Sequence, residues 1–264
     1  MKKYLIYTLL LTCLAFSTIN AMPLSPESVS NLRTSGQLED VLARQTQAHA
    51  LGVDAPGSNV LEGIRQLHRD NPDEVTLQVL IILVDFEDNE ANNDEFPPEH
   101  FEQLLFSIDE FEPGSMREWY RENTYDEVDI IGDVIGWVRL PETYAYYVNR
   151  NNGNGGWPQN SQRMTYDAVQ LVNDDVDFSQ YDNDDDGNVD GIFVVHAGAG
   201  AEQNDGNRDM IWSHAWGLNN HRLQYDGVWV DRYSTEPDDG QIGVFGHEAG
   251  HALFGIPDLY DRGY

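Results

Sequence analysis

A chain of 264 residues, 40% of them hydrophobic, is long enough to fold around a buried core, which excludes a protein that is disordered throughout. It carries 46 acidic residues against 15 basic ones, a net charge of −31, and this charge argues against nucleic acid and anionic membrane surfaces as partners. The acidic residues either bind calcium or form a solvated surface. Most must belong to the surface, because no plausible number of ions would use 46 carboxylates.

The first 21 residues, MKKYLIYTLLLTCLAFSTINA, have the pattern of a secretory signal peptide. Two lysines precede an uncharged run, and the small residue Ala21 follows at a suitable cleavage point. A transmembrane anchor is the weaker alternative, because the run is short for a span and no basic flank follows it. We therefore expect a secreted, extracellular protein that leaves the membrane after signal cleavage.

Removal of residues 1–21 would take away Cys13, the single cysteine, and both lysines of the chain, Lys2 and Lys3. The mature chain would then carry 13 arginines against 46 acidic residues, a net charge of about −33. It could form no disulfide. Bound metal ions are one way in which a secreted protein can replace that cross-bracing.

Residues 22–75 are expected to form a pro-segment that packs on the domain after it. Apolar residues at helical spacing predict two polar helices here, separated by DAPGSN. The first carries Leu38, Val41 and Leu42, and the second carries Leu61, Ile64 and Leu67. This is too little apolar surface for an independent domain.

Residues 76–264 are predicted to be the N-terminal part of a catalytic domain with both strands and helices. The apolar run from Val79 to Val84 is typical of a strand buried on both faces. Further strands are expected in GIFVVH and in EVDIIGDVIGWVRL, where two glycines predict a pair of strands or a bent one. Helices are expected after Pro97–Pro98, after a capping box of Ser115 and Glu118, and from Ser161, with Met164, Ala168, Leu171 and Val172 on one face.

The stretch GHEAGHALFGIPDLYD contains the pattern H-E-x-x-H, with His247, Glu248 and His251. On a helix, residues four apart lie on one face, so both imidazoles can reach one zinc ion while Glu248 addresses a water bound to it. Gly255 is placed to be the left-handed residue after the helix. The chain then delivers Asp258, which is either the third zinc ligand or a carboxylate that stabilises the turn.

These groups predict a hydrolytic mechanism. Zinc would polarise a scissile carbonyl and lower the pKa of its water towards about 7. Glu248 would accept the proton of that water and pass it to the leaving amine.

The stretch YDNDDDGNVDG matches the first nine positions of a calcium-binding loop. The twelfth position is Phe193 instead of a bidentate glutamate, so a true EF-hand is excluded. A calcium-bound loop tied to a strand is expected, against the alternative of a solvated acidic turn. The candidate ligands are Asp182, Asp184, Asp186, Asn188 and Asp190.

With these motifs the chain resembles the immune inhibitor A family of secreted bacterial metallopeptidases, which is related to the metzincin-like zinc peptidases. The matching segments span about residues 76–261, and LSPESVSNLRTSGQLEDVLAR resembles the pro-segment of that family. They are ILVDFED, GSMREWY, VIGWVRLP, DNDDDGNVDGIFVVHAGAGAE, IWSHAW and HEAGHALFGIPDLYD.

The resemblance implies an α+β, zincin/metzincin-like catalytic domain, with a twisted mixed sheet, packed helices and an active-site helix. It implies a zymogen in which His247, His251 and Asp258 bind zinc, Glu248 is the general base, and the loop from Asp182 to Asp190 binds calcium. Residues 22–264 contain no cysteine, so a cysteine bound to zinc cannot provide latency and some other group must block the site.

The chain departs from the family pattern in two places. Phe254 intervenes before Gly255, where the family has its glycine three residues after the second histidine. An extra residue rotates the next part of the chain by about 100° on an ideal helix, so Asp261 is an alternative third ligand. Relatives also continue past this motif into a lower subdomain with a methionine-containing turn. We therefore expect a fragment of a longer enzyme, truncated after the zinc motif and inactive alone.

The leading hypothesis is a secreted, calcium-stabilised zinc endopeptidase that is made as a zymogen and whose partners are protein or peptide substrates and its own pro-segment. The alternative is a non-catalytic, calcium-dependent surface or adhesion module with a structural metal site. A zinc hydrolase acting on a non-peptide bond is an intermediate possibility. Glu248 favours hydrolysis, because a structural zinc site needs no acid between its histidines.

Overall fold

The structure is a computed structural model of the chain and describes residues 23–55, 67, 69–70 and 74–258. Within these residues, no helix has both the length and the apolar character needed to cross a membrane. The expected signal peptide, most of the second expected N-terminal helix and Asp261 lie outside the described residues.

From residue 75 onwards the chain contains both strands and helices. The helices are α2 (Pro26–Ser35), α3 (Leu38–Ala50), α5 (Pro98–Phe106), α6 (Met116–Asn123), α7 (Tyr144–Val148), α8 (Ser161–Val172) and α9 (Ile242–Phe254). The strands are β1 (Val75–Asp85), β2 (Val128–Arg139), β3 (Ile192–His196), β4 (His214–Gly217), β5 (Leu223–Tyr225), β6 (Val228–Val230) and β7 (Arg232–Pro237).

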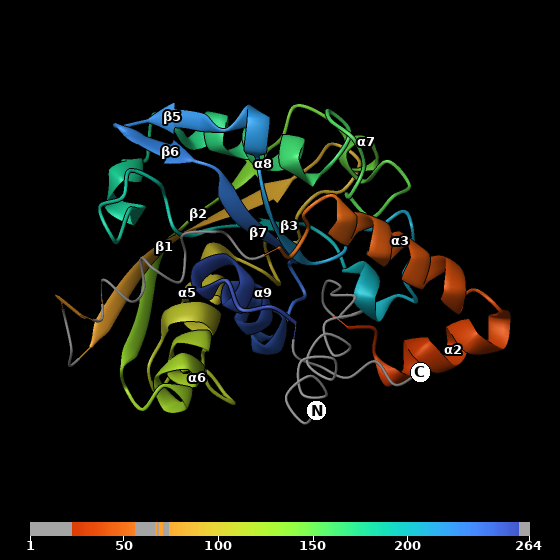
Figure 1. The fold of residues 1–264 in the computed structure, drawn as a ribbon, viewed down its shortest axis with the longest axis horizontal. Helices are drawn as coiled ribbons and strands as arrows, with labels where there is room; N and C mark the ends of the chain where they lie inside the picture. The colour runs from red at the N-terminus through yellow and green to blue at the C-terminus, as the bar shows by residue number, and fades with distance from the viewer. Residues whose placement is uncertain (1–22, 56–66, 68, 71–73, 259–264) are drawn as a thin grey trace, which may run out of the picture.

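Five strands form the central sheet, in the order β2-β1-β3-β7-β4. The neighbours from β2 to β7 run parallel, and β4 pairs antiparallel with β7 at one edge. Helices α7 and α8 cover one face, while α5, α6 and α9 cover the other (Figure 1). The mixed sheet with packed helices that the sequence predicted is therefore present.

Strand β1 lies inside the sheet and is buried on both faces, as its apolar run predicted. Its side chains alternate between two cores, as the two-residue period of a strand requires. Leu80, Ile82 and Val84 pack into the core that contains α8. Val79 and Ile81 pack into the core that contains α5 and α9.

Strand β2 is one continuous strand, so of the two expected alternatives the pair of strands is wrong and the single strand is present. Its two glycines permit close approach to β1 instead. A Cβ atom at Gly132 would overlap with the backbone of Val79, and one at Gly136 would overlap with the side chain of Leu83. The pairing register of β1 with β2 shifts between Ile82 and Val84, so the parallel ladder is irregular at this point.

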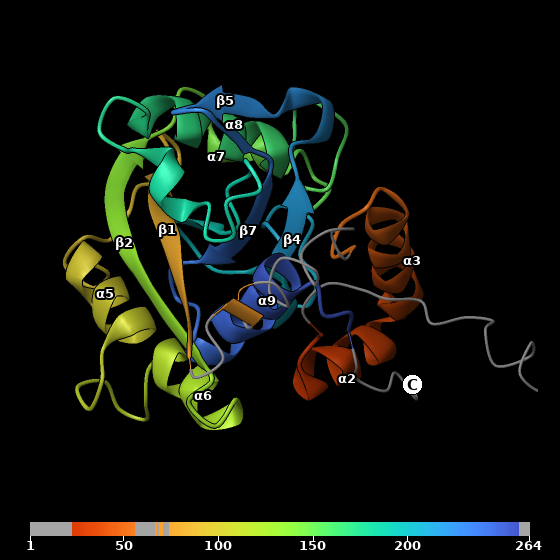
Figure 2. The same cartoon turned by 60° about the vertical axis from the view of Figure 1, so that its left-hand side comes forward.

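The N-terminal helices α2 and α3 pack beside the sheet domain (Figure 2). Leu32, Leu38 and Val41 form a small core with Ala201 and Trp212. Val53, which follows α3, is 1% exposed and belongs to the main core on the α8 side. This segment is therefore held by apolar contacts at two separate places.

The predicted starts of helices α6 and α8 are confirmed. Ser115 and Glu118 form the expected capping box at the start of α6, with both of its hydrogen bonds present. Helix α8 begins at Ser161 as expected, but Leu171 is 49% exposed, so its assignment to the buried face was wrong. The buried face instead includes Thr165 and Val169.

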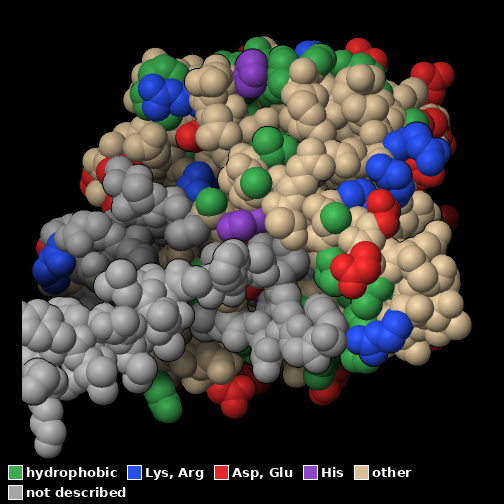
Figure 3. Space-filling model, turned by 45° about the vertical axis from the view of Figure 1, so that its right-hand side comes forward, with side chains coloured by type: hydrophobic (Ala, Val, Ile, Leu, Met, Phe, Trp, Pro, Cys, Tyr) green, Lys and Arg blue, Asp and Glu red, His purple; other side chains and the backbone are tan. Residues whose placement is uncertain are grey.

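One face of the molecule is mixed in character. On the face drawn in Figure 3, hydrophobic side chains of the described residues form separate spots among acidic, basic and uncharged ones. Isolated exposed apolar side chains of this kind are common on soluble proteins and identify no binding face.

Candidate metal centre

Helix α9 presents the H-E-x-x-H motif from a buried position against β7 and β4. Phe245, Ala249 and Leu253 pack into the core on the α5 side, which orients the opposite side of the helix towards the site. The helix ends at Gly255, whose φ of 59° is left-handed, as predicted. The chain then turns back beneath the last helical turn.

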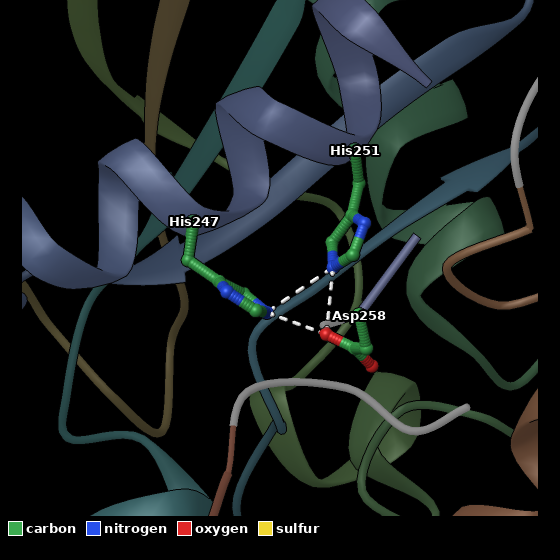
Figure 4. A group of neighbouring side chains, drawn as sticks. All are labelled: His247, His251 and Asp258. Atoms are coloured by element: carbon green, nitrogen blue, oxygen red, sulfur yellow. Dashed lines mark hydrogen bonds and ion pairs between the residues drawn. The ribbon is translucent and has the colours of Figure 1, made fainter. Parts of the chain in front are cut away.

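This turn brings the predicted zinc ligands together. His247 and His251 point from one side of α9 towards the carboxylate of Asp258 (Figure 4). The two Nε2 atoms are 3.1 Å apart, and each lies 3.2 Å from Asp258 Oδ1. The three donor atoms thus form a nearly equilateral triangle.

The spacing of these atoms fits a zinc ion. A tetrahedral site with ligand bonds of about 2.0 Å has donor atoms roughly 3.3 Å apart, close to the separations observed. The mixture of two imidazole nitrogens and one carboxylate oxygen is also a donor set that zinc accepts. His247, His251 and Asp258 could therefore hold the metal, with one tetrahedral position left for another group.

The tautomer of His251 suits this role. Its Nδ1 contacts the carbonyl of Ile256, which can only accept a hydrogen bond, so Nδ1 carries the proton and Nε2 is left as the metal-facing donor. In the metal-free chain, burial tends to raise the pKa of Asp258, but hydrogen bonds from Nε2 of His247 and His251 outweigh it and lower the pKa to about 2; a bound metal would take the place of these protons. Asp258 is therefore ionised, as a metal ligand must be.

Phe254, the residue that departs from the family pattern, is accommodated by the helix itself. It is the last residue of α9, and its ring packs 5.2 Å from that of Tyr120, centroid to centroid. The Tyr120 hydroxyl donates a hydrogen bond to the carbonyl of Gly246 at 2.7 Å. Helix α6 thereby supports the lengthened last turn, and Asp258 still reaches the histidines.

Glu248 lies between the histidines in sequence and is fully buried. Neither of its carboxylate oxygens has a hydrogen-bond partner among the described residues. Burial raises its pKa well above the ordinary range, and the negative charges of Asp54 and Glu236 raise it further. Such a carboxyl group favours the bound proton and is a stronger base than one in water.

Asp54 is a site residue that sequence reasoning missed. Its carboxylate oxygen lies with ligand atoms of Glu248 and His251, all within 4.8 Å of one another. Burial raises the pKa of Asp54 to about 7. A single aspartate at the start of DAPGSN is typical of a connecting loop, so no signal in the sequence could have identified it.

The predicted calcium loop is partly assembled. Oxygen atoms of Asp182, Asp184 and Asp190 lie within 4.8 Å of one another, whereas Asp186 is outside that group. The carboxylate of Asp186 accepts hydrogen bonds from the backbone and side chain of Asn188 instead.

Backbone hydrogen bonds also close this loop. The carboxylate of Asp182 accepts from the N–H groups of Asp186 and Gly187, each at 3.0 Å. Calcium binding at Asp182, Asp184, Asp186, Asn188 and Asp190 stays a prediction.

Comparison with known proteins shows which protein family the chain resembles. The family described as "Immune inhibitor A peptidase M6, catalytic domain" matches residues 66–264. The chain is 30% identical over 233 residues to "Immune inhibitor A" from Bacillus thuringiensis subsp. alesti, which covers 71% of this chain and 34% of that protein. It is 29% identical over 236 residues to "Pre-pro-metalloprotease PrtV" from Vibrio cholerae serotype O1 (strain M66-2), covering 72% and 25%. The chain thus spans about a quarter to a third of the length of these relatives.

Proposed function

The chain belongs to the immune inhibitor A peptidase M6 family, and from that premise we propose that it is a secreted zinc endopeptidase that hydrolyses peptide bonds in proteins. We further propose that it is made as a zymogen, with residues 22–75 as the pro-segment, and that calcium stabilises it. The observation that carries the proposal is the triangle formed by His247, His251 and Asp258, with Glu248 on the same helix.

The residues of the site have separate tasks in the proposed reaction. Zinc, when bound, supplies Lewis-acid chemistry that polarises the scissile carbonyl and makes a coordinated water acidic. His247, His251 and Asp258 would hold the metal, and the Ile256 carbonyl orients the His251 ring.

Glu248 is the proposed general base. It takes a proton from the attacking water and transfers it to the nitrogen of the leaving amine. Its complete burial keeps its carboxylate away from bulk water, which raises its basicity and strengthens its interaction with the reacting groups. A metal site with a purely structural role would have no use for this buried acid.

The test is hydrolysis of a denatured protein substrate by the secreted, processed protein, together with its zinc content. We expect Glu248→Gln to lower the rate by roughly 10²–10⁴-fold while about one zinc per chain remains, because the base is lost but the ligands are not. Glu102→Gln, at an exposed position on α5, is the matched control and should change neither quantity.

Two outcomes would contradict the proposal in different ways. Full activity in Glu248→Gln would show that Glu248 is not the base. Zinc binding without hydrolysis in the unsubstituted, processed protein would favour the non-catalytic surface module. Loss of activity with a zinc chelator and its return on adding zinc are expected in any preparation that is active.

A further inference from the structure

A cavity of about 350 Å³ lies between helix α3 and the loop of residues 204–209, which precedes β4, and is called the α3 hollow below. Asp40, Val41 and Arg44 line it from α3, and Arg208 and Asp209 line it from the loop. Its lining residues include no member of the candidate metal centre or of the acidic loop. The α3 hollow is therefore a separate feature of the molecule.

Positive charge is concentrated in the α3 hollow. Arg44, Arg150 and Arg208 all line it, although the chain has only 15 basic residues against 46 acidic ones. Burial lowers the pKa of Arg44, and the positive charge of Arg208 lowers it further, while Asp40 opposes both effects. Two guanidinium groups that line one hollow therefore repel each other, and a bound anionic group would relieve that repulsion.

These two arginines keep hydrogen-bond donors for a ligand. Arg44 donates to the carbonyl of Gly206 at 2.9 Å and to the side chain of Asn152, which fixes its position and leaves others of its N–H groups available. Arg208 donates from Nε to the carbonyl of Arg150 at 3.2 Å, and its terminal nitrogens have no hydrogen-bond partner among the described residues. A guanidinium group binds a carboxylate through parallel hydrogen bonds of this kind.

Aspartates also line the α3 hollow, and they argue against a simple dianion as its ligand. Asp40 Oδ2 lies 3.4 Å from Arg44 Nε, and Asp209 Oδ2 lies 3.5 Å from Arg150 Nη1. The side chains of these two aspartates are 65% and 58% exposed, so the ion pairs contribute little and leave carboxylate oxygens available. Together with Asp205, these carboxylates would repel phosphate or sulfate but attract an ammonium group.

One part of the wall is apolar. Leu32 from α2 and Val41 from α3 line the α3 hollow, and each is 2% exposed. Both belong to the small core that also contains Trp212, so this part of the wall is held in place. Pockets for small molecules have volumes of about 300–1,000 Å³, and the α3 hollow lies at the lower end of that range. It therefore suits a small molecule with one apolar group.

From this combination we propose that the α3 hollow binds a small zwitterion, namely a free amino acid or dipeptide with an apolar side chain. Its carboxylate pairs with the guanidinium groups of Arg208 and Arg44, and its ammonium group pairs with the aspartates. Its side chain packs on Leu32 and Val41. Peptide hydrolysis releases molecules of this class, so the proposed enzyme would supply its own ligand. The inference goes beyond the proposed function, and its test requires neither a metal nor activity.

The alternative is that the charged residues only join the N-terminal helices to the loop. Arg44 of α3 does contact Gly206 of the loop directly. In that case no zwitterion binds. A ligand in the α3 hollow, in contrast, touches the helix and the loop together and stabilises the folded chain by mass action.

Isothermal titration calorimetry on the full chain tests the proposal, with L-leucine and leucyl-leucine as the probes. We expect saturable binding of at least one probe with a Kd below about 1 mM. 4-Methylpentanoate lacks the ammonium group and 3-methylbutylamine lacks the carboxylate. Each should bind at least about tenfold more weakly than leucine, because each loses a charge-assisted hydrogen bond. Sulfate should bind no more tightly than these analogues.

Arg208→Gln identifies the place of binding. Arg208 is exposed, so its substitution should leave the fold intact while it removes the available partner of the carboxylate. We expect the affinity for the probe to fall about tenfold or more. Arg33→Gln, at an exposed arginine on α2 outside the α3 hollow, is the charge-matched control and should bind the probe as the unsubstituted chain does. The probe should also raise the thermal midpoint of Arg33→Gln more than that of Arg208→Gln.

Three outcomes would overturn the proposal. The first is that neither probe binds saturably, and the second is that Arg208→Gln binds the probe as tightly as Arg33→Gln. The third is equal affinity for 4-methylpentanoate and leucine, which would show an anion site that does not recognise the ammonium group. None of these results concerns zinc or hydrolysis, so each would leave the zinc-peptidase proposal standing.

Discussion

Asp190, in the acidic loop, shows how one side chain can make stability depend on pH. Burial raises its pKa to about 7, and the hydrogen bonds it accepts from Asn183 only partly oppose this. The folded chain therefore binds a proton at Asp190 more tightly than the unfolded chain does. The resulting stabilisation is complete below about pH 4, the ordinary range for aspartate, and is lost as the pH rises through about 7.

We expect the thermal midpoint of the metal-free chain, measured in a chelator, to depend on this proton. As the pH is raised from 4 to 8, the thermal midpoint of Asp190→Asn should rise relative to that of the unsubstituted chain at the same pH. The reason is that the amide has no charge to bury. Asp185→Asn, at a neighbouring exposed position, is the control. A constant difference between Asp190→Asn and the unsubstituted chain across this range would contradict the assignment. Calcium at pH 8 should stabilise the unsubstituted chain more than Asp190→Asn if the loop binds the ion.

At the level of single residues, the sequence identified the site residues that lie close together along the chain. His247, Glu248 and His251 are recognisable because helical geometry alone puts them near one another. Asp258 was recognisable because a short turn delivers it. Asp54 was not, since its position depends on the packing of Val53 and on pairing with β4, which are long-range contacts that no local pattern encodes.

Helix α9 is the element on which the site depends most, and its end determines where Asp258 lies. Gly255 adopts a left-handed φ of 59° that a side chain disfavours. We expect Gly255→Ala to lower the free energy of unfolding by about 1–2 kcal/mol, measured by urea titration, and to weaken zinc binding because the turn that carries Asp258 is displaced.

Gly243→Ala, in the first turn of the same helix, is the matched control. An added Cβ at Gly243 would meet nothing within 4 Å. Alanine is the better helix former, so this variant should gain about 0.5–1 kcal/mol and keep its zinc affinity. Equal effects of the two substitutions would mean that the left-handed position at Gly255 has no particular importance.

Elements were predicted well where one local signal dominated. The apolar run of β1, the capping box of α6 and the glycine after α9 each correspond to the observed structure. Strand β2 was harder, because its glycines serve contacts with β1 and do not interrupt the strand. The exposure of Leu171 likewise depends on how α8 is rotated against the sheet, which spacing alone does not determine.

The whole molecule carries an excess of negative charge that its basic residues cannot neutralise. A net charge of −31 places many like charges on one chain, and their repulsion lowers the stability of the folded state. The screening length falls from about 10 Å at 0.1 M salt to about 3 Å at 1 M.

We therefore expect the thermal midpoint of the chain, measured in a chelator, to rise by several degrees as the NaCl concentration is increased from about 0.05 to about 1 M. KCl should act equally, because screening depends on ionic strength and not on which monovalent cation is present. A midpoint that falls or stays constant with salt would mean that favourable ion pairs, such as that of Arg117 with Asp129, outweigh the general repulsion.

The division of the chain at residue 75 is a further expectation about the whole molecule. The first strand of the sheet begins at Val75, close to where the sequence changes from polar helices to an apolar run. The assignment of residues 22–75 as a pro-segment stays a prediction, and the described part of that segment is packed against the sheet domain through Val41 and Val53.

The guanidinium of Arg232, which contacts the carbonyls of Ala55 and His251 together, joins the N-terminal segment to the last turn of the metal-binding helix. If docking of the segment and metal binding both depend on the position of Arg232, they are thermodynamically linked, and the coupling between them is reciprocal. Whatever free energy the docked segment adds to metal binding, the metal must add to docking of the segment. If zinc binds at this site as proposed, a chelator should loosen the segment as well as empty the site.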